Sequence, residues 1–306
     1  TLTKENIMNK YIVTTTIQPP TRATKLFAKM EDWTLVVVGD TKTPHHLYDQ
    51  LDCIYIHPEQ QEAKYKELSD AIGWKKIQRR NIGFVYAYQN GADIVATIDD
   101  DNIPYENWGK DLLVGKKVER DFYETSNLVF DPLSVTNNSN LWHRGYPIEC
   151  IPTKNDVTYI ARRTTEVMVQ ANLWDGDPDI DATQRLTKRP CVKFDQIEPY
   201  STYNYTVFNS QNTFIHRDVL KHYMVFPFLG RMDDIWGSYY LQKFMDSSQI
   251  VFDKPTVYQE RNEQDLIRNL ENELDGYRYT QDYVLGVHQL SDEVQNFITE
   301  YQKYFD

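Results

Sequence analysis

Three consecutive aspartates, Asp99, Asp100 and Asp101, follow an apolar run at residues 94–98. Neighbouring carboxylates repel one another and raise one another's pKa, so this arrangement is costly unless water or a cation offsets it. Mg²⁺ and Mn²⁺ are commonly held by one or two carboxylates, with substrate phosphates completing the coordination. We therefore expect Mn²⁺ or Mg²⁺ bound here together with a diphosphate.

Two alternatives for the aspartate run stay open at this point. A solvated acidic turn accounts for DDD without any ligand, because three-residue motifs occur by chance. The stretch DDDNI also comes close to the DxDx(T/V) nucleophile motif of haloacid-dehalogenase-type phosphatases. That motif normally lies on the first strand, whereas several β-α units precede it here.

A second acidic pair, Asp233 and Asp234, lies in GRMDDIW at the start of a predicted helix. A carboxylate in such a place can remove a proton from an attacking hydroxyl. It can equally cap the helix.

Acidic and aromatic residues elsewhere offer further candidate contacts to a ligand. Asp179 and Asp181 in DGDPDIDA could accept hydrogen bonds from ligand hydroxyls, or they could be turn residues near Pro178. Trp236 could stack on a ligand ring, although core packing is the commoner role of a tryptophan.

Composition limits the class of protein. The 306 residues include 41% hydrophobic residues, enough for a substantial core. Lys and Arg number 33 against 45 Asp and Glu, a net charge of −12, which disfavours nucleic acid as a partner. Cys53, Cys150 and Cys191 form no CxxC pair, so a zinc site or disulfide scaffold is not indicated.

Hydropathy predicts no membrane span, because no apolar run approaches about 20 residues. Residues 1–10 lack the apolar core of a signal peptide, so we expect a cytoplasmic protein. The chain begins with Thr rather than Met, however, so a membrane anchor trimmed from upstream stays open as the alternative.

The first third of the chain must position these residues, and it alternates strands with helices. Strands are predicted at 11–17, 33–38, 53–56 and 94–98, and helices at 22–30, 59–72 and 75–90. This order implies a mostly parallel sheet whose carboxyl ends share one edge. Thr15, Thr16, Asp40 and the three aspartates would then meet in one cleft.

Beyond residue 104 the alternation weakens. We predict a loop at 135–147, a strand at 166–173, a polar connection at 195–214, helices at 217–224 and from 234 or 235, and tail helices at 263–274 and 291–304. The chain is predicted to divide into two halves of one domain, at 1–110 and 111–260, and a helical tail at 261–306.

The run QRRNIGFVYAYQNGADIVATIDDDN resembles the segment of GT-A glycosyltransferases in which an R-N-x-G helix leads into the strand that bears a DxD motif. Further stretches resemble the STELLO family of glycosyltransferases: TTTIQPPTRATKLFAKMEDWTLVVVGDTKTP, VMVQANLWDGDPDIDATQRLT, FNSQNTFIH and GRMDDIWGSYYLQ. A more distant similarity is to reversibly glycosylated polypeptides and UDP-arabinopyranose mutases. The resemblance implies a GT-A-like α/β fold with a mostly parallel central sheet flanked by helices. The nucleotide-sugar-binding half would be 1–110 and the acceptor half 111–260.

The resemblance also implies roles on the donor side. Asp101 would bind the metal, and Asp99 would face it or the ribose, while the role of Asp100 is the least defined. Thr15 and Thr16 would contact the base, if they are not simply β-branched strand residues.

Two further donor-side roles follow from the same resemblance. Asp40 would contact uracil or ribose. Arg80 would neutralise phosphate charge, unless it forms a surface ion pair.

On the acceptor side the resemblance implies Asp234, in preference to Asp233, as the catalytic base. Asn212, in FNSQNTFIH, joins Asp179, Asp181 and Trp236 as a substrate-binding candidate. The implied function is metal-dependent transfer of a sugar, with inversion, from a nucleoside-diphosphate sugar, taken as a UDP-sugar, to a glycan or other hydroxyl acceptor. A UDP-sugar mutase, the phosphatase, and a catalytically silent nucleotide-sugar-binding protein remain as alternatives.

Overall fold

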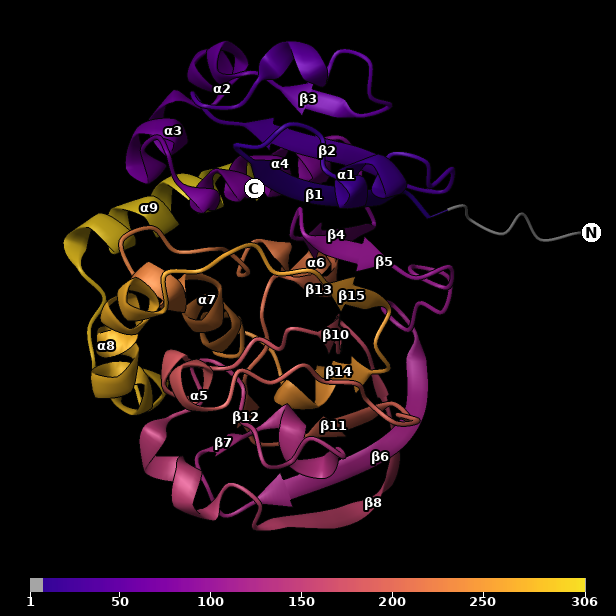
Figure 1. Ribbon diagram of the computed structural model, residues 1–306, viewed down its shortest axis with the longest axis vertical. Helices are drawn as coiled ribbons and strands as arrows, with labels where there is room; N and C mark the ends of the chain where they lie inside the picture. Colours follow the sequence, from indigo (N-terminus) through magenta and orange to yellow (C-terminus); the bar gives the residue numbers. More distant parts are fainter. Residues whose placement is uncertain (1–7, 306) are drawn as a thin grey trace, which may run out of the picture.

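A ten-stranded sheet runs through the molecule (Figure 1). The structure is a computed structural model, and it describes residues 8–305. From one edge to the other the strands are β3 (Ile54–Ile56), β2 (Thr34–Gly39), β1 (Lys10–Thr16), β4 (Ile94–Ile98), β13 (Asn212–His216), β9 (Val169–Asn172), β14 (Ile250–Asp253), β11 (Tyr200–Thr202), β6 (Lys117–Thr125) and β8 (Val157–Glu166).

The first four of these strands are mutually parallel, and five of the nine pairings in the sheet are parallel. Strand β13 runs antiparallel to β4, with Asn212 opposite Ile98. Residues that follow β1, β2 and β4 therefore share one edge of the sheet, which is where ligands bind in open α/β sheets.

Helices flank the sheet. They are α1 (Arg22–Phe27), α2 (Pro58–Lys64), α3 (Lys66–Ile72), α4 (Arg80–Gln89), α5 (Ala182–Thr187), α6 (Arg217–Leu220), α7 (Asp233–Leu241), α8 (Leu266–Val284) and α9 (Asp292–Gln302). Successive strand side chains enter two cores, since Val13 packs in the cluster that contains Phe84 of α4 and Ile12 in the cluster that contains Phe27 of α1. The predicted α/β class, with helices around a central sheet, is confirmed.

Two small sheets complete the strands. Strand β15 (Val257–Gln259) lies between β10 (Asp175–Gly176) and β5 (Asn102–Pro104), and β12 (Tyr205–Thr206) pairs with β7 (Val129–Phe130). The Glu260 amide donates to the Asp101 carbonyl at 3.0 Å. This ladder holds the segment after β15 beside the aspartate run.

Several predicted boundaries were wrong. The helix predicted at 75–90 begins at Arg80, after a short 3-10 turn at Ile77–Arg79, and the helix predicted at 59–72 breaks at Tyr65, which has φ −132° and ψ 37°. The connection predicted at 195–214 contains β11, β12 and the start of β13. The first tail helix starts at Leu266 and continues to Val284.

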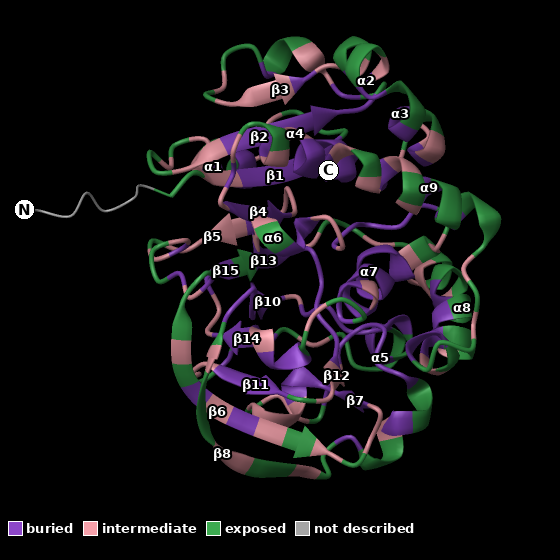
Figure 2. Ribbon diagram, turned by 180° about the vertical axis from the view of Figure 1, so that it is seen from behind, coloured by how far each residue is buried: buried purple, intermediate pink, exposed green. Residues whose placement is uncertain are grey.

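Strands β6 and β8 were not predicted from the sequence. They pair antiparallel at the edge of the sheet opposite β3, and Figure 2 shows both strands largely exposed or intermediate, unlike the buried strands β1 and β4. Strands with charged residues on both faces lack the hydrophobic pattern that marks buried ones.

Within residues 8–305, no helix is both long and apolar enough to cross a membrane.

Candidate active site

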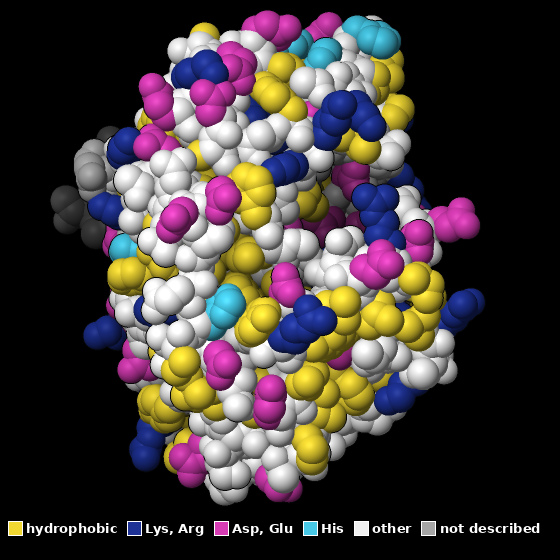
Figure 3. All heavy atoms as spheres, turned by 90° about the vertical axis from the view of Figure 1, so that its left-hand side faces the viewer, with side chains coloured by type: hydrophobic (Ala, Val, Ile, Leu, Met, Phe, Trp, Pro, Cys, Tyr) yellow, Lys and Arg dark blue, Asp and Glu magenta, His cyan; other side chains and the backbone are white. Residues whose placement is uncertain are grey.

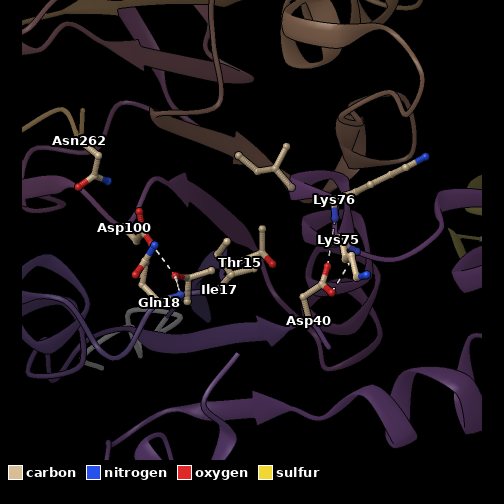
Figure 4. Close-up of a pocket in the computed structure, with 10 residues that line it drawn as sticks. Thr15, Ile17, Gln18, Asp40, Lys75, Lys76, Asp100 and Asn262 are labelled. Atoms are coloured by element: carbon tan, nitrogen blue, oxygen red, sulfur yellow. Dashed lines mark hydrogen bonds between the residues drawn. The ribbon is translucent and has the colours of Figure 1, made fainter. Parts of the chain in front are cut away.

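A cavity of about 260 Å³ opens at the carboxyl ends of β1, β2 and β4 (Figure 4). Asn262 and Asp100 lie on one side of it, and Asp40, Lys75 and Lys76 lie on the other. Its lining includes four of the predicted site residues, namely Thr15, Thr16, Asp40 and Asp100. The strand order therefore brings these distant positions together, and we name this space the donor cavity.

Asp40 organises the loop that closes one side of the donor cavity. Its carboxylate accepts hydrogen bonds from the Thr41 amide at 2.5 Å, the Lys75 amide at 3.0 Å and the Lys76 amide at 3.1 Å. Lys75 has φ +61°, so the chain turns sharply there. These bonds explain why no helix begins at residue 75.

The two threonines at the end of β1 have different partners. Thr15 Oγ1 donates to the Val38 carbonyl at 2.7 Å and so joins β1 to β2. Thr16 Oγ1 donates to Asp100 Oδ2 at 2.5 Å, and its oxygen accepts from the Gln18 amide at 2.9 Å. Thr16 therefore fixes the second aspartate of the run.

The three aspartates lie in distinct environments. Arg80 Nη2 donates to Asp99 Oδ1 at 2.6 Å, and Asp100 is held by Thr16. Asp101 Oδ1 is buried and accepts no hydrogen bond within the described part of the chain. Burial, followed by the charges of Asp99 and Asp100, raises the pKa of Asp101 to about 7.

A divalent cation fits this arrangement. A buried carboxylate oxygen without a donor is expensive, and a bound cation would compensate it. In residues 8–305 no group of three or more His, Cys, Asp or Glu side chains is arranged to hold a metal ion. Asp101, with Asp99 two residues before it, would supply one or two carboxylates, the number with which Mg²⁺ is commonly bound together with substrate phosphates.

The three residues that the R-N-x-G pattern specifies, Arg80, Asn81 and Gly83, each have a structural role. Arg80, whose side chain is 1% exposed, holds Asp99 and also donates to Ser210 Oγ at 2.8 Å. Asn81 makes two hydrogen bonds to the backbone of Val225, at 2.7 and 2.9 Å. A Cβ at Gly83 would lie 2.4 Å from Val13 Cγ1, so only glycine lets α4 approach β1 this closely.

A second cavity, of about 220 Å³, adjoins the donor cavity, and Ile77 lines both. We name it the acceptor cavity. Figure 3 shows a hollow with acidic side chains inside it and Lys or Arg side chains around it. The charged residues that line the acceptor cavity are Asp99, Arg144, Asp179, Arg231, Asp233, Asp234 and Arg261.

Arg144 is the centre of this second cluster, and we made no prediction for it from the sequence. Its Nε and Nη2 donate to the two carboxylate oxygens of Asp179 at 2.8 and 3.0 Å, and Nη2 also donates to Asp234 Oδ1 at 3.1 Å. Arg144 is the single charged residue in the predicted loop at 135–147, and this was the signal that could have singled it out.

Asp233 and Asp234 differ in their chemistry. Burial alone would raise the pKa of Asp234, but Arg144 and the hydrogen bonds from the Ser210 amide and hydroxyl lower it. Asp233 accepts a hydrogen bond from Gln78 Nε2 at 2.7 Å. Burial and the adjacent charge of Asp234 raise the pKa of Asp233 to about 7.

Three predicted substrate-binding residues line neither cavity. Asp181 caps α5, with Oδ1 accepting from the Gln184 amide at 3.0 Å. Asn212 is fully buried and bonds to Trp108, Leu173 and Thr256. Trp236 stacks on Tyr283 of α8, with ring centroids 4.5 Å apart. The hydrogen bonds and the ring stacking of these three residues account for their burial without a bound substrate.

Helix α8 supports the acceptor cavity from outside. Glu273, which is fully buried, accepts from Arg231 Nε at 2.7 Å and from the Ala182 amide at 2.7 Å. Gly230 has φ +55°, and a Cβ there would lie 2.4 Å from the Asn272 carbonyl oxygen. The tail therefore fixes the loop that precedes Asp233.

Comparison with known proteins extends these observations. No protein-family model matches the chain. The chain is 25% identical over 210 residues to the probable glycosyltransferase STELLO2 and 24% identical over 260 residues to the probable glycosyltransferase STELLO1, both of Arabidopsis thaliana. These alignments cover 62% and 77% of this chain but only 27% and 33% of the relatives, so the chain spans about a third of their length.

Among solved structures, glucosyl-3-phosphoglycerate synthase from Mycobacterium tuberculosis, in complex with Mn²⁺, UDP-glucose and phosphoglyceric acid, aligns with 92% of this chain and 81% of its own. The TM-score is 0.48 and the identity 12%. The same enzyme with Mg²⁺ and UDP aligns at a TM-score of 0.47 and 10% identity. The predicted resemblance to STELLO glycosyltransferases is confirmed by the two plant relatives.

Proposed function

We propose that this chain is a metal-dependent glycosyltransferase that uses a UDP-sugar. The observation that carries the proposal is the buried, unpartnered Oδ1 of Asp101, which lines neither cavity itself but directly follows Asp99 of the acceptor cavity and Asp100 of the donor cavity. One cavity lies at the strand ends, where nucleotides bind in α/β sheets, and the other contains a carboxylate suited to proton transfer. Similarity to two probable glycosyltransferases supports the same conclusion.

The donor would lie across the aspartate run. Its nucleoside would occupy the donor cavity beside Thr15, Thr16 and Asp40, and its diphosphate would reach Asp99 and Asp101. Those two carboxylates would hold Mn²⁺ or Mg²⁺, which when bound stabilises negative charge on a leaving diphosphate. Arg80 orients the Asp99 carboxylate through their 2.6 Å contact.

We assign proton transfer to Asp233 in preference to Asp234. A general base works best when its pKa lies near the working pH, and the pKa of Asp233 is raised to about 7. Asp234 is held by Arg144 and Ser210, so it is oriented as a fixed charge beside the base. Asp233 would take the proton from the acceptor hydroxyl as that oxygen attacks the anomeric carbon, giving inversion.

Asp179 is the remaining charged candidate in the acceptor cavity. Burial would raise its pKa, but Arg144 lowers it well below the usual range. Asn209 Nδ2 also donates to Asp179 Oδ2, at 2.7 Å. We propose that Asp179 acts on the substrate indirectly, through the position of Arg144.

A turnover assay tests the proposal. The protein is incubated with a panel of UDP-sugars, a panel of free sugars as hydroxyl acceptors and Mn²⁺, and UDP release, the glycosylated acceptor and sugar isomers are followed by chromatography. We expect UDP release that Asp233→Asn abolishes and that Asp275→Asn, a change at a side chain 73% exposed, leaves unchanged. Ring isomerisation without UDP release would indicate a mutase, and metal-dependent hydrolysis of p-nitrophenyl phosphate a phosphatase.

A further inference from the structure

The segment that follows β15 borders both cavities. Arg261 lines the acceptor cavity, and the next residue, Asn262, lines the donor cavity. The Glu260 amide donates to the Asp101 carbonyl at 3.0 Å, so the segment is fixed beside the aspartate run. Burial and the neighbouring carboxylates raise the pKa of Asp101, and the charge of Arg261 partly opposes that rise. A diphosphate lying across the aspartate run would therefore pass close to Arg261.

Arg261 differs from the other two arginines that line the acceptor cavity. Arg144 donates to Asp179 at 2.8 Å, and Arg231 donates to Glu273 at 2.7 Å. The Arg261 side chain is 11% exposed, and its Nε is buried without an acceptor in the part of the chain that the structure describes. A buried donor without an acceptor is costly, so this site favours a ligand that supplies one.

The carboxylate paired with Arg261 neutralises it only in part. Asp177 Oδ1 lies 3.1 Å from Arg261 Nε, but the same oxygen lies 2.5 Å from Arg185 Nη1. Within residues 8–305 this oxygen accepts no aligned hydrogen bond. Burial, followed by the like charge of Arg261, lowers the pKa of Arg185, so the two guanidiniums repel each other. One carboxylate thus serves two cations, and positive charge remains in excess beside the acceptor cavity.

The other cations near the aspartate run are held elsewhere. Arg80 is 1% exposed, lines neither cavity and donates to Asp99. Lys75 and Lys76 lie on the side of the donor cavity opposite Asp100 (Figure 4). Two carboxylates match the charge of a divalent ion, so the charge of a bound diphosphate still requires a cation from the protein.

We propose that Arg261 binds the β-phosphate of the sugar donor and leaves Asp177 to Arg185 when the donor enters; this rests on the proposed glycosyltransferase function. The β-phosphate carries the sugar, so it is the phosphate that faces the acceptor cavity. A guanidinium can donate to two phosphate oxygens at once, a stronger contact than a share in one carboxylate.

This contact would act during transfer as well as binding. The bond between the anomeric carbon and the β-phosphate oxygen breaks, and its electron pair stays on that oxygen. Arg261 would donate to the phosphate on which this charge develops, while the proton of the acceptor hydroxyl goes to Asp233. Arg261 would therefore be a catalytic residue that contacts the leaving group.

Comparison of UDP with UMP tests the contact, because UMP lacks the β-phosphate. Calorimetry with Mn²⁺ measures the affinity for UDP, and displacement of UDP measures that for UMP. We expect Arg261→Met to weaken UDP binding about tenfold or more and UMP binding less than about twofold. Arg22→Met is the matched control, because Arg22 pairs with Glu260 through a side chain that is 70% exposed. It should leave both affinities unchanged.

Two further variants separate the phosphate contact from a structural ion pair. Asp177→Asn removes the carboxylate that competes for Arg261, so it should bind UDP at least as tightly as the wild type. A purely structural pair predicts instead that Asp177→Asn and Arg261→Met weaken UDP binding alike. Arg261→Lys, a milder change that keeps the charge but not the planar fork, should weaken UDP selectively by about threefold or more. Circular dichroism confirms the folding of each variant.

The inference is overturned if neither Arg261 variant weakens UDP binding, if UDP and UMP lose affinity equally, or if Asp177→Asn weakens UDP binding as much as Arg261→Met does. Wild-type protein that binds no UDP in the presence of Mn²⁺ would instead overturn the proposed function, and this inference with it.

Discussion

Asp233 and Asp234 are adjacent and line one cavity, yet their surroundings move their pKa values in opposite directions. Arg144 and Ser210 hold Asp234 ionised, and the resulting fixed charge, together with burial, keeps a proton on Asp233 up to about pH 7. We therefore propose separate roles for these two neighbouring carboxylates, Asp234 as a positioned charge and Asp233 as a proton acceptor.

This pair predicts the pH dependence of transfer. Asp233 must be unprotonated to accept a proton, so the transfer rate should rise with pH up to about 7 and level off above it. Initial rates measured from about pH 5.5 to about pH 8.5 check this, with UDP binding recorded at each pH. Asp233→Asn should have no such rise. A rate that is flat across this range would contradict the role of Asp233.

Arg144 should contribute strongly to the free energy of unfolding of the protein through its ion pairs in the acceptor cavity. Arg144→Met leaves Asp179 and Asp234 buried without their cation, and we expect a loss of about 3 to 5 kcal/mol in the free energy of unfolding. Urea unfolding measures this loss. Arg278→Met, at a side chain 61% exposed, should change the stability by less than about 0.5 kcal/mol.

The same variant has a pH signature. Arg144 lowers the pKa of Asp179 and of Asp234, so its stabilisation is full above about pH 4 and is lost as the pH falls through those lowered values. The difference in stability between wild type and Arg144→Met should therefore narrow in acid. A difference that widens in acid would contradict the ion pairs.

Helix α8 should matter for turnover as well as for stability. Glu273→Ala removes the acceptor of the Arg231 and Ala182 hydrogen bonds, and we expect a loss of about 2 to 4 kcal/mol together with slower transfer. Glu271→Ala, at an exposed position of the same helix, is the control. Equal rates and equal unfolding midpoints for the two variants would refute this support.

Trp236 should behave as a packing residue. Trp236→Phe loses the hydrogen bond to Thr280, at 3.0 Å, and should cost about 1 kcal/mol. Affinity for a UDP-sugar, measured by calorimetry on the folded variant, should stay within about twofold of the wild type. A tenfold loss of affinity would restore Trp236 as a sugar contact.

Local patterns in the sequence were sufficient to predict that the residues around the donor cavity lie together. The apolar run before Asp99 marks a buried strand, and parallel strand order places Thr16, Asp40 and Asp100 at one edge. Glycine in RNIG likewise matches a close helix–strand approach. These features depend on neighbours in sequence or on simple topology.

The acceptor side depends on contacts that no local pattern reveals. Arg144 meets Asp179 and Asp234 across 35 and 90 residues, and a loop arginine has no periodicity to mark it. Trp236 was selected by residue type and Asn212 by the resemblance of the FNSQNTFIH stretch, and neither criterion distinguishes a buried hydrogen bond or ring contact from a ligand contact. The choice between Asp233 and Asp234 as the catalytic base likewise depends on which of the two carboxylates contacts Arg144.

Isothermal titration of UDP, with and without Mn²⁺, into the wild type, Asp101→Asn and Asp275→Asn tests the central claim most directly. Asp101 supplies the unpartnered oxygen, so we predict Mn²⁺-dependent UDP binding that Asp275→Asn keeps and that Asp101→Asn weakens about a hundredfold or more. UDP binding that does not depend on Mn²⁺, or that is equally tight in Asp101→Asn, would contradict a metal site at the end of β4.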